Sequence, residues 1–300
     1  NEISAGSLIV DTLIYTFIGV VSLITVYPFI FIFSASISDP TEVMANAVWL
    51  YPKGFSLLSY QKVFNNTYLW RSFFNSIFFT LSIVVFNSIN SMLAGYALSK
   101  KGLYGRKVIV VYLLIPMFFA GGLIPSFILM VNLHLFNSIW AIILPGIVSI
   151  WNIILVRTYI GTIPLSLQES AIIDGASEFK ILFRIIIPLA KPIIAVISLY
   201  TAIGVWNNWF NAMIYLPRRT EWHPLQLFLT KVLIWGQMQT VVGAAEKMDP
   251  EMMKQRLLNA AVGVQLKYTI IMVSSLPIIM VYPFLQKYFI KGALLGSLKE

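Results

Sequence analysis

The chain has 300 residues, of which 58% are hydrophobic and 11% are charged, and its formal net charge is +9. Soluble proteins carry about 25% charged residues, so this composition excludes a soluble domain. The bases lie at the ends of apolar blocks, which argues against a nucleic-acid-binding face and is typical of membrane orientation. The absence of cysteine excludes disulfides, thiolate metal sites and cysteine catalysis.

Six apolar segments, taken in chain order, approach or exceed the roughly 20 residues that a helix needs to cross a bilayer. We expect spans near residues 13–34, 73–98, 108–131, 139–159, 193–216 and 268–289. The sequence shows no soluble segment and no internal repeat, so we expect one membrane domain over residues 1–300. The predicted fold class is an all-α integral membrane protein with six transmembrane helices.

The bases near the span ends predict the orientation of the chain. Residues 99–107 carry four bases and no acid, and further bases follow near the C-terminus, Lys287, Lys291 and Lys299. Because Lys and Arg collect on the cytoplasmic side, we expect both termini and residues 99–107 to be cytoplasmic, together with residues 163–188. The two long polar segments are then expected outside the membrane, residues 38–68 and 217–262.

The sequence lacks the patterns of a catalytic or nucleotide-binding chain. It contains no GxxxxGK[ST] phosphate loop, and no acid lies inside a predicted span away from its ends. His134 and His223 are isolated in loops, where we expect solvated side chains rather than metal ligands. We therefore expect no catalytic residue, no metal site and no cofactor on this chain. If it drives active transport, another subunit must hydrolyse ATP.

A polar segment interrupts the apolar chain between the fourth and fifth predicted spans. We expect a first short helix that Thr162 or Ser166 caps and that runs to about Asp174. Gly175 provides the permissive backbone for a sharp turn. Ser177 can then cap a second helix.

The second short helix combines apolar and charged side chains. Four apolar side chains fall on one helical face, Phe179, Leu182, Phe183 and Ile186, and the charged side chains point elsewhere. Such a segment fits an ordinary solvated loop. Its compact helices and central glycine also fit a docking element for a partner protein.

The segment closely resembles the EAA loop of permease subunits of bacterial ABC importers. That family's pattern is Glu-Ala-Ala, three residues, Gly, nine residues, then Ile-x-Leu-Pro. Here the pattern begins at Glu169, reaches its glycine at Gly175 and ends at Pro188, with every spacing kept. The departures are Ser170 in place of alanine and Ile187 in place of leucine.

Other segments resemble the carbohydrate branch of these permeases, namely residues 206–216, 223–229 and 276–297. More narrowly, they resemble the second permease subunit of importers for complex oligosaccharides released from polysaccharides. The resemblance, which extends to the maltose-transporter permeases, implies a type I ABC importer permease fold with cytoplasmic coupling helices. It implies a core permease domain over residues 70–290 and a coupling loop over residues 163–188.

The resemblance also implies the partners. They are a homologous second permease in a heterodimer, two ATPase subunits that bind ATP and Mg²⁺, an extracytoplasmic sugar-binding protein and an oligosaccharide substrate. Membrane lipid surrounds such a chain, and no nucleic acid is expected. The expected location is the bacterial cytoplasmic membrane, crossed several times.

The resemblance further implies which residues take part in coupling. Glu169 would pair with a base of the ATPase, and Gly175 would form a turn that no side chain should fill. The full set of expected coupling residues is Glu169, Ser170, Ala171, Asp174, Gly175, Ala176, Ile185 and Pro188.

The candidate substrate path is a cluster of aromatic and amide residues, Trp206, Asn207, Asn208, Trp209 and Asn211. Aromatic faces stack on sugar rings, and carboxamides hydrogen-bond sugar hydroxyls. The alternative is that these asparagines join helices and that the tryptophans lie at the membrane interface. Four other asparagines in or near the spans favour helix–helix contacts, Asn75, Asn87, Asn90 and Asn152.

Two other functions remain open from the sequence. A stand-alone secondary carrier or channel would need ion coupling, and the intramembrane acids typical of such carriers are absent. An ABC permease for a non-sugar solute, such as a peptide or phosphate, would share the same fold. The segments that resemble the carbohydrate branch and the aromatic–asparagine cluster argue against it.

Overall fold

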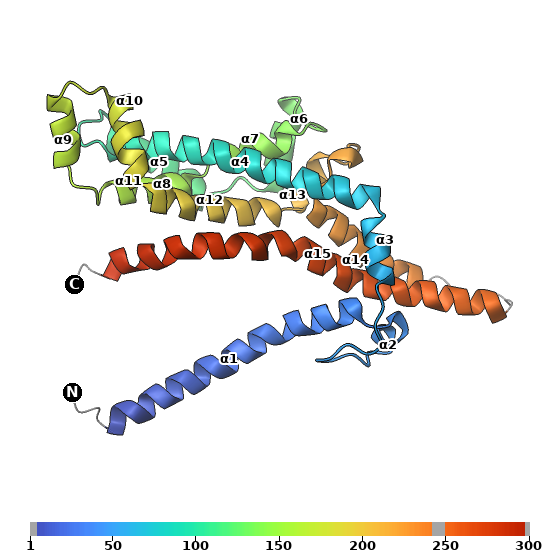
Figure 1. Cartoon of the computed structure of the whole chain (residues 1–300). Helices are drawn as coiled ribbons and strands as arrows, with labels where there is room; N and C mark the ends of the chain where they lie inside the picture. The colour runs from blue at the N-terminus through green and yellow to red at the C-terminus, as the bar shows by residue number, and fades with distance from the viewer. Residues whose placement is uncertain (1–4, 242–249, 298–300) are drawn as a thin grey trace. The chain divides into compact units, whose positions relative to one another are not determined.

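A computed structural model describes residues 5–241 and 250–297, and every regular element within these ranges is helical (Figure 1). Residues 242–249 of the predicted outer segment and Lys299 of the predicted cytoplasmic tail lie outside the described residues. The chain divides into two compact units. Unit 1 comprises residues up to Trp70 together with Leu229–Leu276, and unit 2 comprises Arg71–Phe228 together with the residues from Pro277 onward.

The first helices are α1 (Ala5–Ile37), α2 (Pro40–Met44), α3 (Leu58–Phe64), α4 (Thr67–Ser99), α5 (Arg106–Phe118), α6 (Leu123–Asn132), α7 (Trp140–Ile147) and α8 (Ile150–Ile160). The polar segment then forms α9 (Ser166–Ile173), α10 (Glu178–Ile181), a π-helical turn η1 (Leu182–Ile186) and α11 (Ile187–Leu189). The remaining elements are α12 (Lys191–Trp206), α13 (Phe210–Tyr215), the 3₁₀ turn η2 (Thr220–Trp222), α14 (Leu225–Val241) and α15 (Pro250–Ser297).

Four stretches of the described residues are helical, long and apolar enough to cross a membrane, Val10–Ile37, Thr67–Ser99, Trp140–Ile160 and Leu257–Met280. Two bent helix pairs, α5 with α6 and Glu178–Leu189 with α12, bring the number to six if each pair forms one span. The all-α membrane fold predicted from the sequence is confirmed, and six spans agree with this upper number.

The third predicted span is not the continuous helix that its hydropathy suggests. α5 and α6 meet at a bend of 112°. Pro116 lies inside α5, which ends two residues later, and Gly122 precedes α6 with a φ of 86°. Because proline removes a helical N–H donor and glycine alone adopts this backbone readily, the chain turns here.

The fifth predicted span, residues 193–216, is interrupted as well. α12 ends at Trp206, and α13 begins only at Phe210. The Asn208 side-chain oxygen accepts a hydrogen bond from the backbone N–H of Asn211 at 3.1 Å. Such local side-chain bonds compete with helical backbone bonds, which explains the break.

In unit 1, one buried glutamine connects three helical segments. Gln265 of α15 is fully buried, and its amide nitrogen donates to the carbonyl oxygens of Ser36 at 3.1 Å and Ser38 at 2.6 Å. Its side-chain oxygen accepts a hydrogen bond from the Ser59 hydroxyl of α3. The glutamine thereby satisfies backbone carbonyls at the end of α1 that no further helical turn could satisfy.

In unit 2, α4 contributes residues to two buried clusters. Near its C-terminal end, Met92 and Tyr96 belong to a buried cluster with Val156, Ile160, Ala171, Ile181, Leu182, Ile186, Ala190 and Ile197. Closer to its N-terminal end, Phe79 and Ile83 belong to a second cluster with Ile143 and Leu216. Figure 1 shows α9 and α10 at the end of unit 2 where α4 ends.

α4 and α8 approach closely at Gly95. A Cβ at this position would lie 2.6 Å from Cγ1 of Val156 and 3.1 Å from the backbone nitrogen of Arg157. Val156 is fully buried and β-branched, so it has little freedom to move aside. Only glycine allows this helix contact.

We therefore predict that Gly95→Ala lowers the free energy of unfolding by about 1–3 kcal/mol, because the added methyl overpacks the α4–α8 contact. Gly204→Ala in α12 is the matched control, since a Cβ there meets nothing within 4 Å. The measurement is the Tm of the detergent-solubilised variants. Equal Tm values for the two alanine variants would contradict the close contact.

Candidate functional site

The polar segment forms a compact helix–turn–helix at one end of unit 2 (Figure 1). Gly175 has a φ of 73° and follows the end of α9. The N–H of Ala176 donates to the carbonyl of Ala171, and the N–H of Gly175 donates to that of Ile172, each at 2.9 Å. These two bonds define a Schellman motif, whose left-handed position glycine occupies without strain. The predicted glycine turn is confirmed.

The ends of the two short helices agree only in part with the sequence prediction. The Ser177 side chain accepts the backbone N–H of Lys180 at 3.4 Å, as expected for the cap of α10. α9 begins without a side-chain cap, and the Thr162 hydroxyl instead donates to the carbonyl of Tyr159. The prediction that Thr162 or Ser166 caps α9 is wrong.

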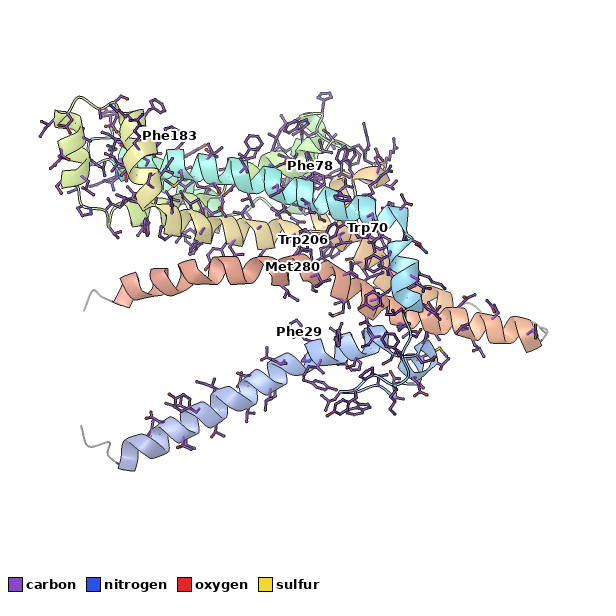
Figure 2. The ribbon with its side chains drawn as sticks, in the orientation of Figure 1. Phe29, Trp70, Phe78, Phe183, Trp206 and Met280 are labelled. Atoms are coloured by element: carbon purple, nitrogen blue, oxygen red, sulfur yellow. The ribbon has the colours of Figure 1, made fainter. Side chains whose placement is uncertain are left out.

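The predicted apolar face of the second helix is divided between core and surface. Leu182 and Ile186 are buried, whereas the side chains of Phe179 and Phe183 are 69% and 59% exposed (Figure 2 labels Phe183). Pro188 has no N–H, and the π-helical turn η1 precedes it. The buried stripe runs through Ile181, Leu182 and Ile186, and the phenylalanines lie outside it.

The expected coupling residues lie in three environments. Those with exposed side chains or backbone are Glu169, Ser170, Asp174, Gly175 and Pro188. Ala176 and Ile185 are half-buried. Ala171 is buried in the cluster that contains Met92 and Tyr96 of α4, so it packs beneath the loop and does not face outward.

Lys100, directly after α4, joins both arms of the loop to that helix. Its Nζ lies 2.8 Å from Oε2 of Glu178 and 3.0 Å from Oε1 of Gln168. It also lies over the ring of Tyr96, 4.5 Å from the centroid. The Tyr96 hydroxyl donates to the same oxygen of Glu178. One cation thus links α4 to the first turn of α10 and to buried Gln168 of α9.

A small cavity of about 150 Å³ lies near the other buried cluster of unit 2. It is lined by Ser76, Phe79, Ile83, Ile142, Pro145, Gly146, Val205, Asn208, Asn211 and Pro224. The lining combines apolar side chains with two carboxamides and one hydroxyl, and it contains no acid or base. Such a lining can hydrogen-bond neutral hydroxyl groups.

Asn87 of α4 satisfies the backbone at the break between α7 and α8, where Gly146 lines the cavity. Its amide nitrogen donates to the carbonyl of Gly146 at 3.0 Å and to that of Ile147 at 3.2 Å. Its oxygen accepts a bond from the amide of Asn152 at 2.8 Å, and that amide also donates to Thr201 at 3.0 Å. Asn87 and Asn152 make helix–helix contacts, as predicted.

Asn75 and Asn90 also donate to backbone carbonyls, and only the Asn90 contact is long. The Asn75 amide donates to the carbonyls of Glu221 at 2.8 Å and His223 at 3.1 Å. Asn90 reaches the carbonyl of Ile147 at 3.5 Å. Asn75 therefore joins α4 to the segment before α14 rather than to a second span.

The five candidate substrate residues are not gathered at one surface. Asn208 and Asn211 line the cavity, but Trp206 does not. Trp206, labelled in Figure 2, is 6% exposed. Its ring meets that of Phe73 edge-on, with 6.0 Å between the centroids. Asn207 is exposed and accepts a bond from Gln226, and Trp209 meets Phe210 edge-on.

Two features of the site were not predicted from the sequence. The Lys100–Glu178 ion pair joins positions 78 residues apart, and no local pattern signals it. His223, expected to be solvated, is 2% exposed, and its Nε2 lies 3.0 Å from the carbonyl of Leu216. The described part of the chain holds no group of acid, histidine or cysteine side chains that could bind a metal ion.

No family model matches the chain. It is 36% identical over 289 residues to the polygalacturonan/rhamnogalacturonan transport system permease protein YtcP of Bacillus subtilis, a match that covers 96% of this chain and 98% of the relative. It is 31% identical over 288 residues to the arabinooligosaccharides transport system permease protein AraQ of the same species, with 94% of each chain covered. A crystal structure of a bacterial ABC transporter involved in import of the acidic polysaccharide alginate contains a chain with a TM-score of 0.85 and 35% identity. That match covers 96% of this chain and 99% of the other.

The carbonyls at the α7–α8 break generate a test of the Asn87 contacts. Asn87→Ala should lower the free energy of unfolding by about 1–2 kcal/mol, because the part-buried carbonyls of Gly146 and Ile147 lose the bonds from the Asn87 amide. Asn87→Ala combined with Asn152→Ala should cost less than the sum of the two, because they share one hydrogen bond. Asn90→Ala, on the same helix, should cost less than Asn87→Ala, because Asn90 reaches only the carbonyl of Ile147, at 3.5 Å. Denaturant titration in mixed micelles measures these changes, and a strictly additive double variant would contradict the shared bond.

Proposed function

The chain belongs to the permease subunits of carbohydrate ABC importers, and we propose that residues 164–188 couple it to ATP hydrolysis on partner subunits. It is a non-catalytic membrane component of such an importer. The relatives lend no support to a stand-alone carrier or channel.

The single observation that carries the coupling proposal is the outward face of the Gly175 turn. Glu169 and Asp174 are exposed and make no ion pair within the described residues. Ile173, which directly precedes Asp174, is 86% exposed. A surface that presents unpaired acids beside an apolar side chain suits docking into a cleft that supplies bases and an apolar wall.

On this proposal Glu169 pairs with a base of the ATPase, and the Gly175 turn approaches the ATPase surface closely. Ser170, Asp174, Ala176, Ile185 and Pro188 complete the contact or support it. Ala171 holds the loop onto α4 from beneath. ATP and Mg²⁺ are bound by two ATPase subunits, and this chain itself binds neither.

We place this loop, residues 99–107 and both termini in the cytoplasm, and the chain in the bacterial cytoplasmic membrane. The ion pair between Lys100 and Glu178 supports a common side for the basic loop and the coupling loop. An ABC importer permease works with a second permease and an extracytoplasmic binding protein. We propose that the segments 38–68 and 217–262 face that binding protein.

For the transported sugar, we propose that the carboxamides of Asn208 and Asn211 contact it at the cavity. The lining supplies hydrogen-bond donors and acceptors and no fixed charge, which suits hydroxyl groups. Trp206, Asn207 and Trp209 lie around this position and are proposed as the flanking part of the path. The relatives' names suggest oligosaccharides of galacturonate, arabinose or alginate as the first candidates.

Replacing Gly175 by asparagine tests whether this position needs glycine for its backbone conformation or for close approach of the ATPase. Asparagine tolerates the left-handed conformation that Gly175 adopts at a φ of 73°, so Gly175→Asn should keep the fold. Its side chain should nevertheless obstruct the ATPase, and we expect sugar uptake and substrate-stimulated ATP hydrolysis to be lost. Both are measured on the complete transporter in proteoliposomes. Uptake at the normal rate by Gly175→Asn would contradict docking at this turn.

Gly105→Asn is the matched control, because Gly105 has a φ of 70° and open space around it but lies outside the coupling loop. It should transport normally. Glu169→Lys should abolish uptake like Gly175→Asn, while the protein still inserts into the membrane.

The cavity proposal predicts a specific kinetic change. Asn211→Leu should raise the KM for uptake by about threefold to tenfold, through loss of one hydrogen bond to the sugar, and leave basal ATP hydrolysis unchanged. The assay is uptake of oligogalacturonides, arabino-oligosaccharides and alginate oligosaccharides. Asn207→Leu, which does not line the cavity, should have a smaller effect. An unchanged KM in Asn211→Leu for every transported sugar excludes this contact.

A further inference from the structure

We infer that α4 carries the movement of the coupling loop to the cavity, with Lys100 and Glu178 as positioning residues at one end and Asn87 at the other. The inference rests on the proposed coupling function of residues 164–188. It assigns a mechanical role to residues that lie outside the EAA pattern or between its fixed positions.

α4 is suited to this role because it is continuous. It runs from Thr67 to Ser99 without a proline. Its neighbours in unit 2 are interrupted: α5 and α6 bend by 112°, α10–α11 and α12 bend by 77°, and α7 ends before α8 begins. A displacement applied to one end of an unbroken helix reaches the other end, whereas a bent pair can absorb it at the break.

At the coupling end, Lys100 holds two arms of the loop at once. Its bonds to Gln168 and Glu178 reach α9 and α10, on opposite sides of the Gly175 turn. The side chain of Lys100 is 26% exposed and that of Glu178 is 58% exposed, so solvent screens the pair only in part. Tyr96 adds a second donor to the same carboxylate, and the buried cluster under the loop packs against the same turn of α4. The loop and the end of α4 therefore form one packed body.

At the cavity end, α4 is fixed to the wall that the sugar would meet. Asn87 holds the carbonyls of Gly146 and Ile147 at the α7–α8 break. Ile83 lies so close to Gly146 that a Cβ there would be 2.9 Å from Cγ2 of Ile83. Ile83 and Gly146 both line the cavity. A shift of α4 consequently displaces the cavity wall.

Between these ends, the glycine contact at Gly95 locks α4 against α8. The chain of contacts thus runs from Glu178 through Lys100 and α4 to Asn87 and Gly146. Every contact in it lies within unit 2, so the chain of contacts needs no movement of one unit against the other. Loss of the Lys100–Glu178 pair should leave the ATPase docked. It should reduce the displacement of the cavity wall that accompanies movement of the coupling loop.

The test measures how accessible the cavity is to a thiol reagent. The chain has no cysteine, so Asn211→Cys introduces one reactive thiol into it. In the complete transporter, the rate at which a charged methanethiosulfonate reagent modifies this thiol is measured with and without ATP and vanadate. ATP with vanadate traps the transporter in one state. When Lys100 is intact, we expect the modification rate in this trapped state to differ by about fivefold or more from the rate without ATP and vanadate. Lys100→Met and Glu178→Gln should bring the ratio of the two rates close to one, with the ATPase still bound.

Three variants make the result specific. The exchange Lys100→Glu with Glu178→Lys should restore the ratio, because it rebuilds the ion pair. Lys101→Met removes an exposed neighbouring base and should leave the ratio at its normal value. Asn87→Ala should lower the ratio while the Lys100 contact stays intact. If Lys100→Met releases the ATPase, the charge exchange must restore both binding and the ratio.

The outcomes distinguish this inference from the proposed function. A normal ratio in Lys100→Met together with a lost response in Gly175→Asn would overturn the inference alone. A normal ratio in both variants would overturn the coupling function of the loop. A charge exchange that fails to restore the ratio would also overturn the role assigned to the ion pair.

Discussion

Backbone groups inside a membrane must find partners within the protein, because lipid offers none. Unit 2 contains several interrupted helices, so this requirement falls on side chains. Asn87 meets it at the α7–α8 break by donating to two carbonyls, and Asn152 and Thr201 hold Asn87 in turn. The broken helix can then present Pro145 and Gly146 to the cavity without leaving those carbonyls unsatisfied.

The same helix that satisfies this break also supports the polar loop. The loop has an inner side and an outer side with different chemistry. Its inner side consists of Ala171, Ile181, Leu182 and Ile186, which pack against Met92 and Tyr96. Its outer side carries Glu169, Asp174 and the exposed phenylalanines. This polar segment is half core and half exposed surface, and the exposed half is the part that we propose as the ATPase contact.

The residues of the aromatic–amide cluster are neighbours in the sequence but lie in different environments in the structure. Its five residues are consecutive or nearly so, which suggested one site. The end of α12 at Trp206 instead separates them: Trp206 is buried against Phe73, and Asn208 and Asn211 reach the cavity. The asparagines are themselves part of the reason for the division, because Asn208 accepts the N–H of Asn211 and interrupts the helix.

The sequence alone determined the membrane fold, the approximate positions of the spans, the glycine turn and the cap at Ser177, because each depends on residues close together in the chain. Hydropathy over about 20 residues and the residue preferences of caps and turns are local signals. Only the tertiary structure decided that Lys100 binds Glu178, that Asn87 serves the carbonyls of Gly146 and Ile147, and that His223 is buried. It also decided which side of α10 faces inward. These features depend on contacts between segments tens of residues apart, and such contacts leave no periodic trace in the sequence.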